Sequence, residues 1–236
     1  MRVAWAAVAM TVATVPAMAQ DVDEGGSEIV VTGRKPLRID GKILRAALER
    51  FARDRTTLSP QGVLRFEFWR GTSRVRADGM QLALTNAAGD RLPVRVDGDG
   101  RVVLDAVPKG RWFLTAPARP HSMALRPMIL SAGTEVEDRR LGDLRMQCRV
   151  AVAMARVQAS ELSMPLIKKF DAKGGCGSRD FQFYHRAEQR LASAVAIGPG
   201  ADDVRPLPLS SRRTSYSPPL SDRKLDHETR VRTTYQ

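Results

Sequence analysis

Residues 80–116, MQLALTNAAGDRLPVRVDGDGRVVLDAVPKGRWFLTA, carry the clearest structural pattern in the chain. Short alternations of apolar and polar residues predict four strands in it, over 80–85, 92–96, 101–104 and 112–115. Asp97-Gly-Asp-Gly100 lies between the second and third of these strands and predicts a hairpin turn. Strands of this length, separated by Gly and Pro every 8–12 residues or so, are typical of an antiparallel β-sandwich or barrel.

Similar patterns extend in both directions from this stretch. Further strands are expected at 63–70, 127–130, 180–184, 191–197 and 229–235. Residues 141–157 suit either a helix or two strands, because small apolar residues dominate them. Prolines at four positions between 205 and 222 exclude a central strand there. We expect a mainly β fold, an antiparallel β-sandwich that is either elaborated or divided into two packed β units, over 60–138 and 139–236.

One amphipathic helix is predicted ahead of the β region, over residues 41–57. Leu44, Leu48 and Phe51 repeat at helical spacing, and charged residues occupy the other side. Asp40 is placed to cap the first turn. A helix of this length is marginal alone, so we expect its apolar stripe to pack against the sheets.

The first 19 residues have the three parts of a secretory signal peptide. Arg2 gives a charged start, an apolar stretch follows to Val15, and Ala17-Met-Ala19 fits a cleavage site. Residues 20–40 are polar and Gly-containing, which predicts a flexible tether. Removing residues 1–19 lowers the net charge of the 236-residue chain from +12 to +11. We expect export to the periplasm, with an extracellular location second.

The basic charge needs a partner class that fits an exported protein. Many Arg and Lys residues gather in 34–76, and the mature chain has no apolar run long enough for a transmembrane segment. Export makes nucleic acid an unsuitable partner. Anionic lipid headgroups, anionic envelope polymers or an acidic envelope protein are the partners expected for this surface.

Two cysteines remain after export, Cys148 and Cys176. In an oxidising compartment they predict a disulfide. A catalytic role for Cys176, in the turn-like Lys173-Gly-Gly-Cys-Gly-Ser178, would leave Cys148 unexplained, and His185 is the one His near it in sequence.

The sequence predicts no catalytic residue, no metal site and no cofactor. His121, His185 and His227 are far apart, and none has a second ligand at metal-binding spacing. Asp97 and Asp99 lack the other ligands of a calcium loop. Nucleotide-binding, nucleophile-elbow and zinc-protease motifs do not occur.

Residues 80–116 resemble the carboxypeptidase-regulatory or transthyretin-like β-sandwich. Asp97-Gly-Asp-Gly100, Val107-Pro-Lys-Gly110 and Trp112-Phe-Leu114 carry the likeness. The resemblance implies a non-catalytic scaffold or binding module over 60–138.

The second half resembles a set of uncharacterised exported proteins of Gram-negative bacteria. Arg140-Leu-Gly-Asp-Leu-Arg145, which leads into Cys148, and Tyr216-Ser-Pro-Pro-Leu-Ser-Asp222 carry this likeness. Arg223-Lys-Leu-Asp-His-Glu228 departs from the Trp-Pro-Asp-Asp-like continuation of that set. The resemblance implies export and no particular activity.

A third resemblance lies at residues 28–33, which are similar to the TonB box of outer-membrane receptors. It implies a partner-binding strand, since an extended β-branched run can add to a partner's sheet. The partner-binding residues predicted here are Glu28, Ile29, Val30, Val31, Thr32, Arg34 and Lys35. An ordinary edge strand is the alternative interpretation of the same residues.

These patterns lead to three functional hypotheses. The first is a periplasmic, non-enzymatic β-sandwich protein with a binding or envelope-structural role. The second is a TonB-linked accessory protein of outer-membrane transport. The third is an envelope hydrolase, for which a pocket joining a His, an acid and a Ser or Cys would be required.

Overall fold

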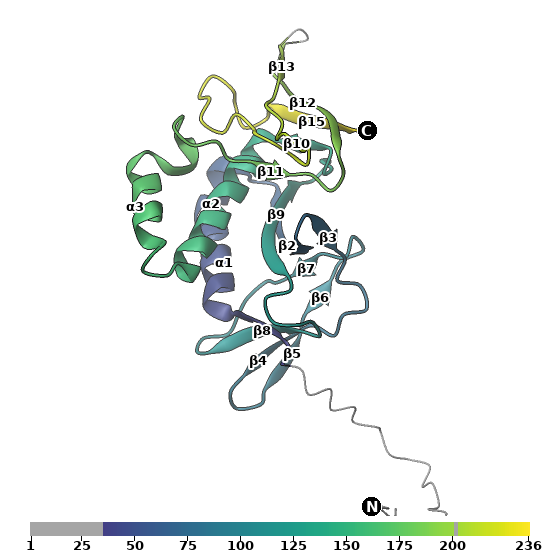
Figure 1. Ribbon diagram of the computed structural model, residues 1–236, viewed down its shortest axis with the longest axis vertical. Helices are drawn as coiled ribbons and strands as arrows, with labels where there is room; N and C mark the ends of the chain where they lie inside the picture. The colour runs from purple at the N-terminus through teal and green to yellow at the C-terminus, as the bar shows by residue number, and fades with distance from the viewer. Residues whose placement is uncertain (1–34, 201–202) are drawn as a thin grey trace, which may run out of the picture. The chain divides into compact units, whose positions relative to one another are not determined.

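The computed structural model describes residues 35–200 and 203–236, which belong to one compact unit (Figure 1). The prediction of a mainly β, antiparallel fold is confirmed, because all paired strands are antiparallel and strands supply most elements. Regions 60–138 and 139–236 both belong to this unit.

The first sheet takes three of its four strands from residues 80–116. Its order is β1-β8-β4-β5, and its strands are β1 (Leu37–Asp40), β8 (Trp112–Ala116), β4 (Ala83–Asn86) and β5 (Arg91–Pro93). The strand predicted over 92–96 is divided at Val94 between this sheet and the next. The chain therefore changes sheets there, which places the two sheets around a shared core.

The second sheet has the order β3-β2-β7-β6, with β9 on the other side of β2. Its strands are β2 (Gly62–Arg70), β3 (Ser73–Val75), β6 (Arg95–Val96), β7 (Val102–Val103) and β9 (Ala124–Ser131). The predicted turn Asp97–Gly100 joins β6 to β7, and the Asp97 carboxylate accepts from the amides of Asp99 and Arg101. Phe66 and Phe68 of β2 are fully buried in the core shared with the first sheet.

Helix α1 (Gly41–Leu58) lies where a helix was predicted, but it does not precede the sheets. Strand β1 comes before it and pairs with β8, so residues 37–40 belong to the fold and the predicted tether over 20–40 is wrong for them. Burial of Leu37 and Ile39 explains the difference, since this short apolar alternation has a strand to pair with. Asp40 caps α1 as predicted.

Helix α2 (Leu141–Gln158) settles the open interpretation of residues 141–157 in favour of a helix. Two of its faces are apolar and each faces a different core. Met146, Val150 and Met154 join the core of the first two sheets, and Leu144 and Cys148 join a second core. Figure 1 shows α2 between α1 with β9 on one side and α3 on the other.

The C-terminal region adds strands and a helix around the second core. A sheet of order β10-β15-β12-β13 contains β10 (Asp138–Arg140), β15 (Arg230–Tyr235), β12 (Leu191–Ile197) and β13 (Val204–Pro206). The other elements are α3 (Met164–Ala172), the short helix η1 (Gly175–Gly177), and the pair β11 (His185–Arg186) with β14 (Ser215–Tyr216). The predicted strands at 191–197 and 229–235 are thus confirmed.

Two expectations for this region are corrected. The region over 139–236 is not β alone, because α2 and α3 lie in it. Residues 180–184 form no strand. Phe181 and Phe183 do alternate with more exposed neighbours, but they pack against Phe170 and the second core instead of pairing with a strand. Burial therefore alternates between successive residues here, although the segment is not hydrogen-bonded to a neighbouring strand.

The start of α2 is held by backbone contacts that require a glycine. Leu141 N–H donates to the Thr229 carbonyl and Gly142 N–H to the His227 carbonyl, at 2.8 and 3.0 Å, so two of the orphan donors of the first turn are satisfied without a side-chain cap. A Cβ on Gly142 would collide with the carbonyl oxygen of Leu58. The glycine thus permits close contact between α1 and α2.

Gly142→Ala is expected to lower the free energy of unfolding by about 2–3 kcal/mol, because backbone atoms of two helices must separate. Urea unfolding measures the change. Gly98→Ala is the matched control, since open space surrounds that position and its change is expected within about 0.5 kcal/mol. Equal stability of Gly142→Ala and the original chain would contradict this contact.

A buried guanidinium lies between the two cores. Arg139 is fully buried and donates to His185 Nε2, the Ile129 carbonyl and Gln147 Oε1, at 2.8, 2.6 and 2.6 Å. Burial, with the adjacent Arg139 second, holds the pKa of His185 well below its ordinary value. The imidazole is therefore neutral and accepts the hydrogen bond.

Acid should selectively weaken this contact. The pKa of His185 is depressed in the folded protein, so its contribution is complete above about pH 6.5 and is lost as the pH falls toward the folded value. The original chain is expected to lose up to about 1.4 kcal/mol per pH unit more than His185→Gln between pH 7 and 5. Urea unfolding across this range tests it, and parallel pH profiles of the two proteins would refute the assignment.

A candidate anion-binding cleft

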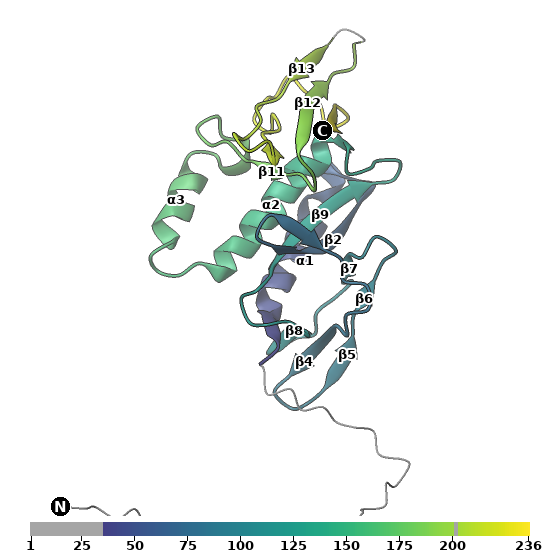
Figure 2. The same cartoon turned by 45° about the vertical axis from the view of Figure 1, so that its right-hand side comes forward.

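A cleft of about 1100 Å³ lies between α2, α3 and the loop over 220–227. Figures 1 and 2 place α3 on the side of α2 away from β2 and β9. Leu220 and Leu225 of the second core line the cleft. Its basic lining residues are Arg50, Arg145, Arg149, Arg156, Lys173, Arg179 and Arg223. Asp171, Asp180 and Asp226 are its acidic residues, which leaves a formal excess of four positive charges.

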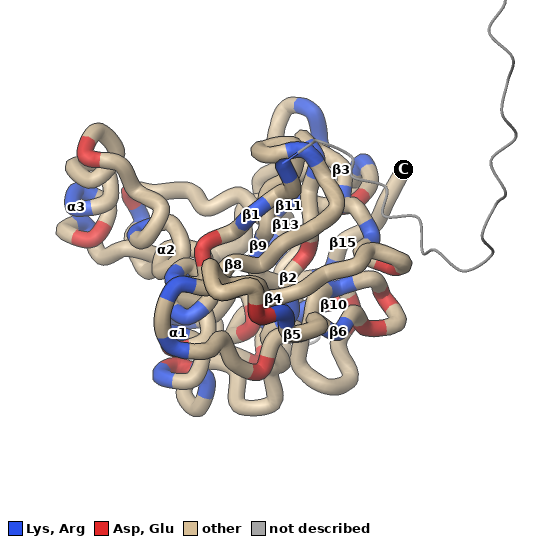
Figure 3. The backbone as a smooth tube through the Cα atoms, turned by 90° about the horizontal axis from the view of Figure 1, so that it is seen from below, with Lys and Arg blue, Asp and Glu red and all other residues tan. Residues whose placement is uncertain are grey.

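One wall of the cleft is the third face of α2. Arg145, Arg149, Val152 and Arg156 repeat at intervals of three and four residues, which places them along one stripe of the helix. Val152 also packs against the second core, so this stripe borders the apolar face that α2 presents to that core. Figure 3 shows basic positions along α1 and at α3, with acidic positions between them.

The opposite wall is fixed by the disulfide predicted from the sequence. Cys148 of α2 is bonded to Cys176 of η1. Gly174 and Gly175 have φ of 95° and 60°, which an L side chain rarely adopts, and this turn brings Cys176 back toward α2. Helix α3 buries no residue of its own, so the disulfide is its main link to the rest of the fold.

A single arginine holds the loop over 220–227 against α2. Arg145 donates to the carbonyls of Leu220, Asp222 and Leu225 at 3.1, 2.6 and 3.1 Å, and to His227 Nδ1 at 2.9 Å. Arg145 and Leu220 belong to the two motifs that resemble exported proteins. The motifs are thus in direct contact, and together they shape the cleft.

The charges of the cleft are unevenly compensated. Arg156 pairs with Asp171, and Lys173 pairs with Asp180. Arg50 and Arg149 share the single carboxylate of Asp54. Arg145 is surrounded by neutral carbonyls, and its burial lowers its pKa from the ordinary value.

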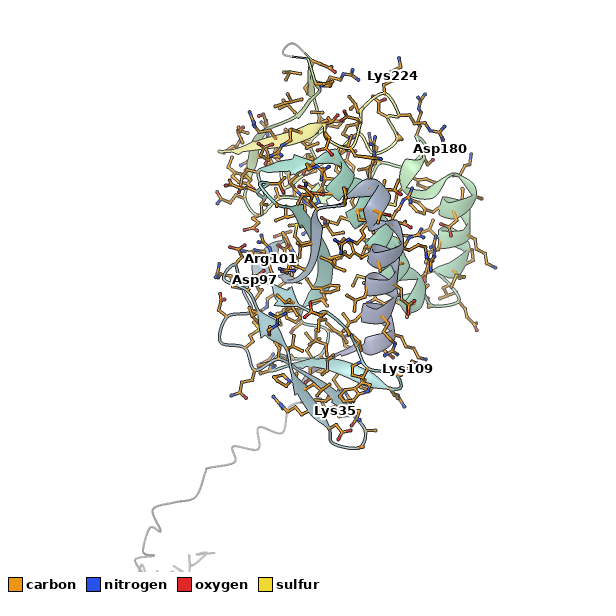
Figure 4. The ribbon with its side chains drawn as sticks, turned by 180° about the vertical axis from the view of Figure 1, so that it is seen from behind. Lys35, Asp97, Arg101, Lys109, Asp180 and Lys224 are labelled. Atoms are coloured by element: carbon orange, nitrogen blue, oxygen red, sulfur yellow. A yellow bond between two sulfur atoms is a disulfide. The ribbon has the colours of Figure 1, made fainter. Side chains whose placement is uncertain are left out.

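Two further arginines, Arg179 and Arg223, are exposed at this cleft. Neither has an ion pair or hydrogen bond with any residue in 35–200 or 203–236. Their charges are therefore available to an anionic ligand. In Figure 4, Asp180 lies near the C-terminal end of α3 and Lys224 on the loop above it, which marks this side of the molecule.

The residues singled out from the sequence lie elsewhere or outside the described part. Glu28, Ile29, Val30, Val31, Thr32 and Arg34 are outside the described residues, as are the predicted signal peptide over 1–19 and most of the predicted tether. Lys35 is exposed at the far end of the unit from Asp180 (Figure 4). The TonB-box resemblance stays a prediction.

Several of the basic residues over 35–76 are occupied by contacts within the fold. Their ion pairs are Arg50 with Asp54, Arg65 with Asp97, Arg74 with Glu67 and Glu188, and Arg76 with Asp78. Arg45 donates to the carbonyls of Pro108 and Gly110. Among the basic residues described in this segment, Arg50 is the one that lines the cationic cleft.

The cleft also contains His227, but its surroundings suit a structural role. Burial, with the Arg145 guanidinium second, lowers the pKa of His227. Ser178 Oγ accepts from the Asp180 amide, and no hydrogen bond joins His227 to a serine among the described residues. Within 35–200 and 203–236, no group of three His, Cys, Asp or Glu is placed to hold a metal ion.

No helix among the described residues is long and apolar enough to cross a membrane. Comparison with protein-family models, curated proteins and solved structures finds no match to this chain. The cleft geometry therefore carries the functional argument.

Sequence reasoning missed Arg179 and Arg223. Each follows a short polar or Gly-rich stretch, Gly174–Ser178 and Ser221–Asp222, with no distinguishing motif. The one usable signal was Cys176, since a disulfide to Cys148 had to bring residues near 176 to the surface of the segment near 148.

Proposed function

We propose that this chain is an exported, periplasmic, non-enzymatic protein that binds an anionic component of the cell envelope in the cleft between α2 and α3. The observation that carries the proposal is the excess of positive charge there, with Arg179 and Arg223 free of ion pairs among the described residues. A concave site with an excess of one sign of charge attracts ligands of the opposite sign. Phosphate and carboxylate groups match this chemistry.

Export is supported by two independent features. The first 19 residues have the order of charged, apolar and small residues that a signal peptide requires. The disulfide Cys148–Cys176 suits an oxidising compartment. An anionic ligand in the cleft would then come from the envelope.

Binding is favoured over hydrolysis by the way the cleft is built. Its one histidine is held by a guanidinium, and its acids are bound to cations or to the Thr229 amide. A hydrolase needs a nucleophile hydrogen-bonded to a base. The cleft instead presents cationic side chains on segments that the Cys148–Cys176 disulfide joins.

Vesicles containing phosphatidylglycerol test this function. The full mature chain is expected to bind them more tightly than phosphatidylcholine vesicles, with affinity that falls as salt rises. Removing two cations with Arg179→Ala/Arg223→Ala should weaken binding about thirtyfold, since each cation contributes about 1 kcal/mol near an anionic surface.

Arg91→Ala/Arg119→Ala is the matched control, because it removes the same charge at exposed positions away from the cleft. It should retain most of the affinity. Equal losses in both double variants would show that net charge alone governs binding and would overturn the assignment to the cleft.

A TonB-linked role remains a separate proposal that rests on residues 28–33. Deleting these residues is the test, with co-purification of the energising complex as the measurement. Unchanged co-purification would end that idea and leave the cleft proposal untouched.

A further inference from the structure

A second cavity of about 460 Å³ adjoins the cleft, and its chemistry is different. Its lining is mixed, and its apolar side chains include Phe170, Phe181, Phe183, Leu207 and Leu220. Its polar side chains include Gln182 and the ion pair of Arg205 with Asp222. Its volume is within the usual range for a small-molecule site.

The two cavities have a common wall. Phe170, Cys176, Arg179 and Leu220 line both of them, so the cationic cleft and the apolar cavity are contiguous. Arg179 is placed at their junction. Its charged group can therefore meet an anionic group while the rest of a ligand lies against aromatic side chains.

The cavity has rigid walls. Pro206, Pro208, Pro218 and Pro219 line it, and proline has no amide donor with which to close a sheet across the space. The disulfide Cys148–Cys176 fixes the wall between the two cavities. The disulfide and the four prolines thus restrict the backbone on two sides of this space.

We propose that this apolar cavity holds the hydrocarbon chain of a single-chain anionic amphiphile whose headgroup lies at Arg179 and Arg223. The proposal rests on the function proposed above and specifies its ligand class. Charge complementarity on one side and aromatic lining on the other favour this occupant over a wholly polar anion, which would leave the aromatic cavity unused. Fatty acids and lysophospholipids share this chemistry.

Titration calorimetry with lysophosphatidylglycerols of increasing chain length, each below its micelle concentration, tests the proposal on the full mature chain. Each added methylene is expected to tighten binding about fourfold until the cavity is filled, because buried methylenes contribute a fixed free energy. Glycerol phosphate, the headgroup alone, should bind weakly and lose affinity with salt. A fatty-acid series distinguishes the two headgroup sources.

Two variants test whether the hydrocarbon chain of the ligand lies in this cavity. Phe181→Ala should flatten the dependence on chain length without altering glycerol phosphate binding, because Phe181 lines only the apolar cavity. Leu166→Ala is the matched control, since Leu166 is 66% exposed on α3 and lines neither cavity. The control should keep the full dependence.

The outcomes separate the two proposals. Affinity that does not change with chain length, with salt-sensitive glycerol phosphate binding intact, would overturn the amphiphile and leave the anion-binding function in place. If Leu166→Ala, but not Phe181→Ala, abolished the dependence of affinity on chain length, the hydrocarbon chain would lie on the exposed face of α3. That result would also overturn the amphiphile proposal. No binding of any anion would contradict both proposals.

Discussion

Asp143→Ala is expected to lower the free energy of unfolding by about 3–5 kcal/mol, one of the two largest effects expected for this protein. The Asp143 carboxylate is fully buried at the start of α2. It accepts from Ser59 Oγ at 2.6 Å, Ser131 Oγ at 2.7 Å and the Ser131 amide at 2.9 Å. Alanine would leave three buried donors without an acceptor, among them Ser131 Oγ, which also accepts from Arg140.

Urea unfolding at neutral pH, with the disulfide intact, measures this effect. Asp143→Asn should lose less, because its amide oxygen still accepts one or two of the bonds. Asp105→Ala is the control, since that side chain is 82% exposed and its ion pair with Arg95 is on the surface. A small effect at Asp143, comparable to that of Asp105, would contradict the network that joins α1, β9 and α2.

Cys148→Ala/Cys176→Ala is the second large expected effect. The disulfide closes a loop with a sequence separation of 28, which corresponds to about 3.6 kcal/mol of stabilisation by loss of entropy in the unfolded chain. The double variant should therefore unfold at a lower urea concentration. Helix α3 should also exchange its amide hydrogens faster, because Arg156–Asp171 and Phe170–Phe181 are its principal remaining contacts.

Reduction of the original chain with dithiothreitol is the matched experiment and should reproduce the loss. If α3 and the rest of the unit kept their exchange rates after reduction, the disulfide would not be what holds the cleft together. The comparison also separates the cross-link from the change of side chain, because reduction leaves both cysteines in place.

Much of the β architecture was predictable because its signals are local. Strand periodicity and the turn residues Asp97–Gly100 are contained in a few consecutive positions. The Asp40 cap and the Cys148–Cys176 bridge were likewise visible. In each case the side chain has few other structural roles at that position, so its role could be predicted from its type and place in the sequence.

Helix α2 was ambiguous for a physical reason. A helix with one buried face shows a clear polar stripe, whereas Val150 and Cys148 of α2 face different cores. The opposite error occurred at 180–184, where Phe181 and Phe183 alternate with polar residues yet have no partner strand. Periodicity reports which side chains are buried, and it cannot report what they are buried against.

The cleft could not be predicted, since its residues come from segments that meet only in the fold. Arg145 of α2, Arg179 after η1 and Arg223 of the C-terminal loop are separated by more than thirty positions each. Local charge density pointed instead to 34–76, where Arg50 and Arg65 pair with acids of the fold. Charge density along the chain therefore did not indicate where uncompensated charge lies in space.

The most direct test of the account is to locate the bound ligand. Hydrogen–deuterium exchange of the full mature chain, with and without saturating lysophosphatidylglycerol, reports which amides the ligand protects. The account predicts slower exchange over 173–180 and 220–227, with no change over 83–103. Protection confined to 83–103, or saturating binding with no protection at the cleft, would contradict it.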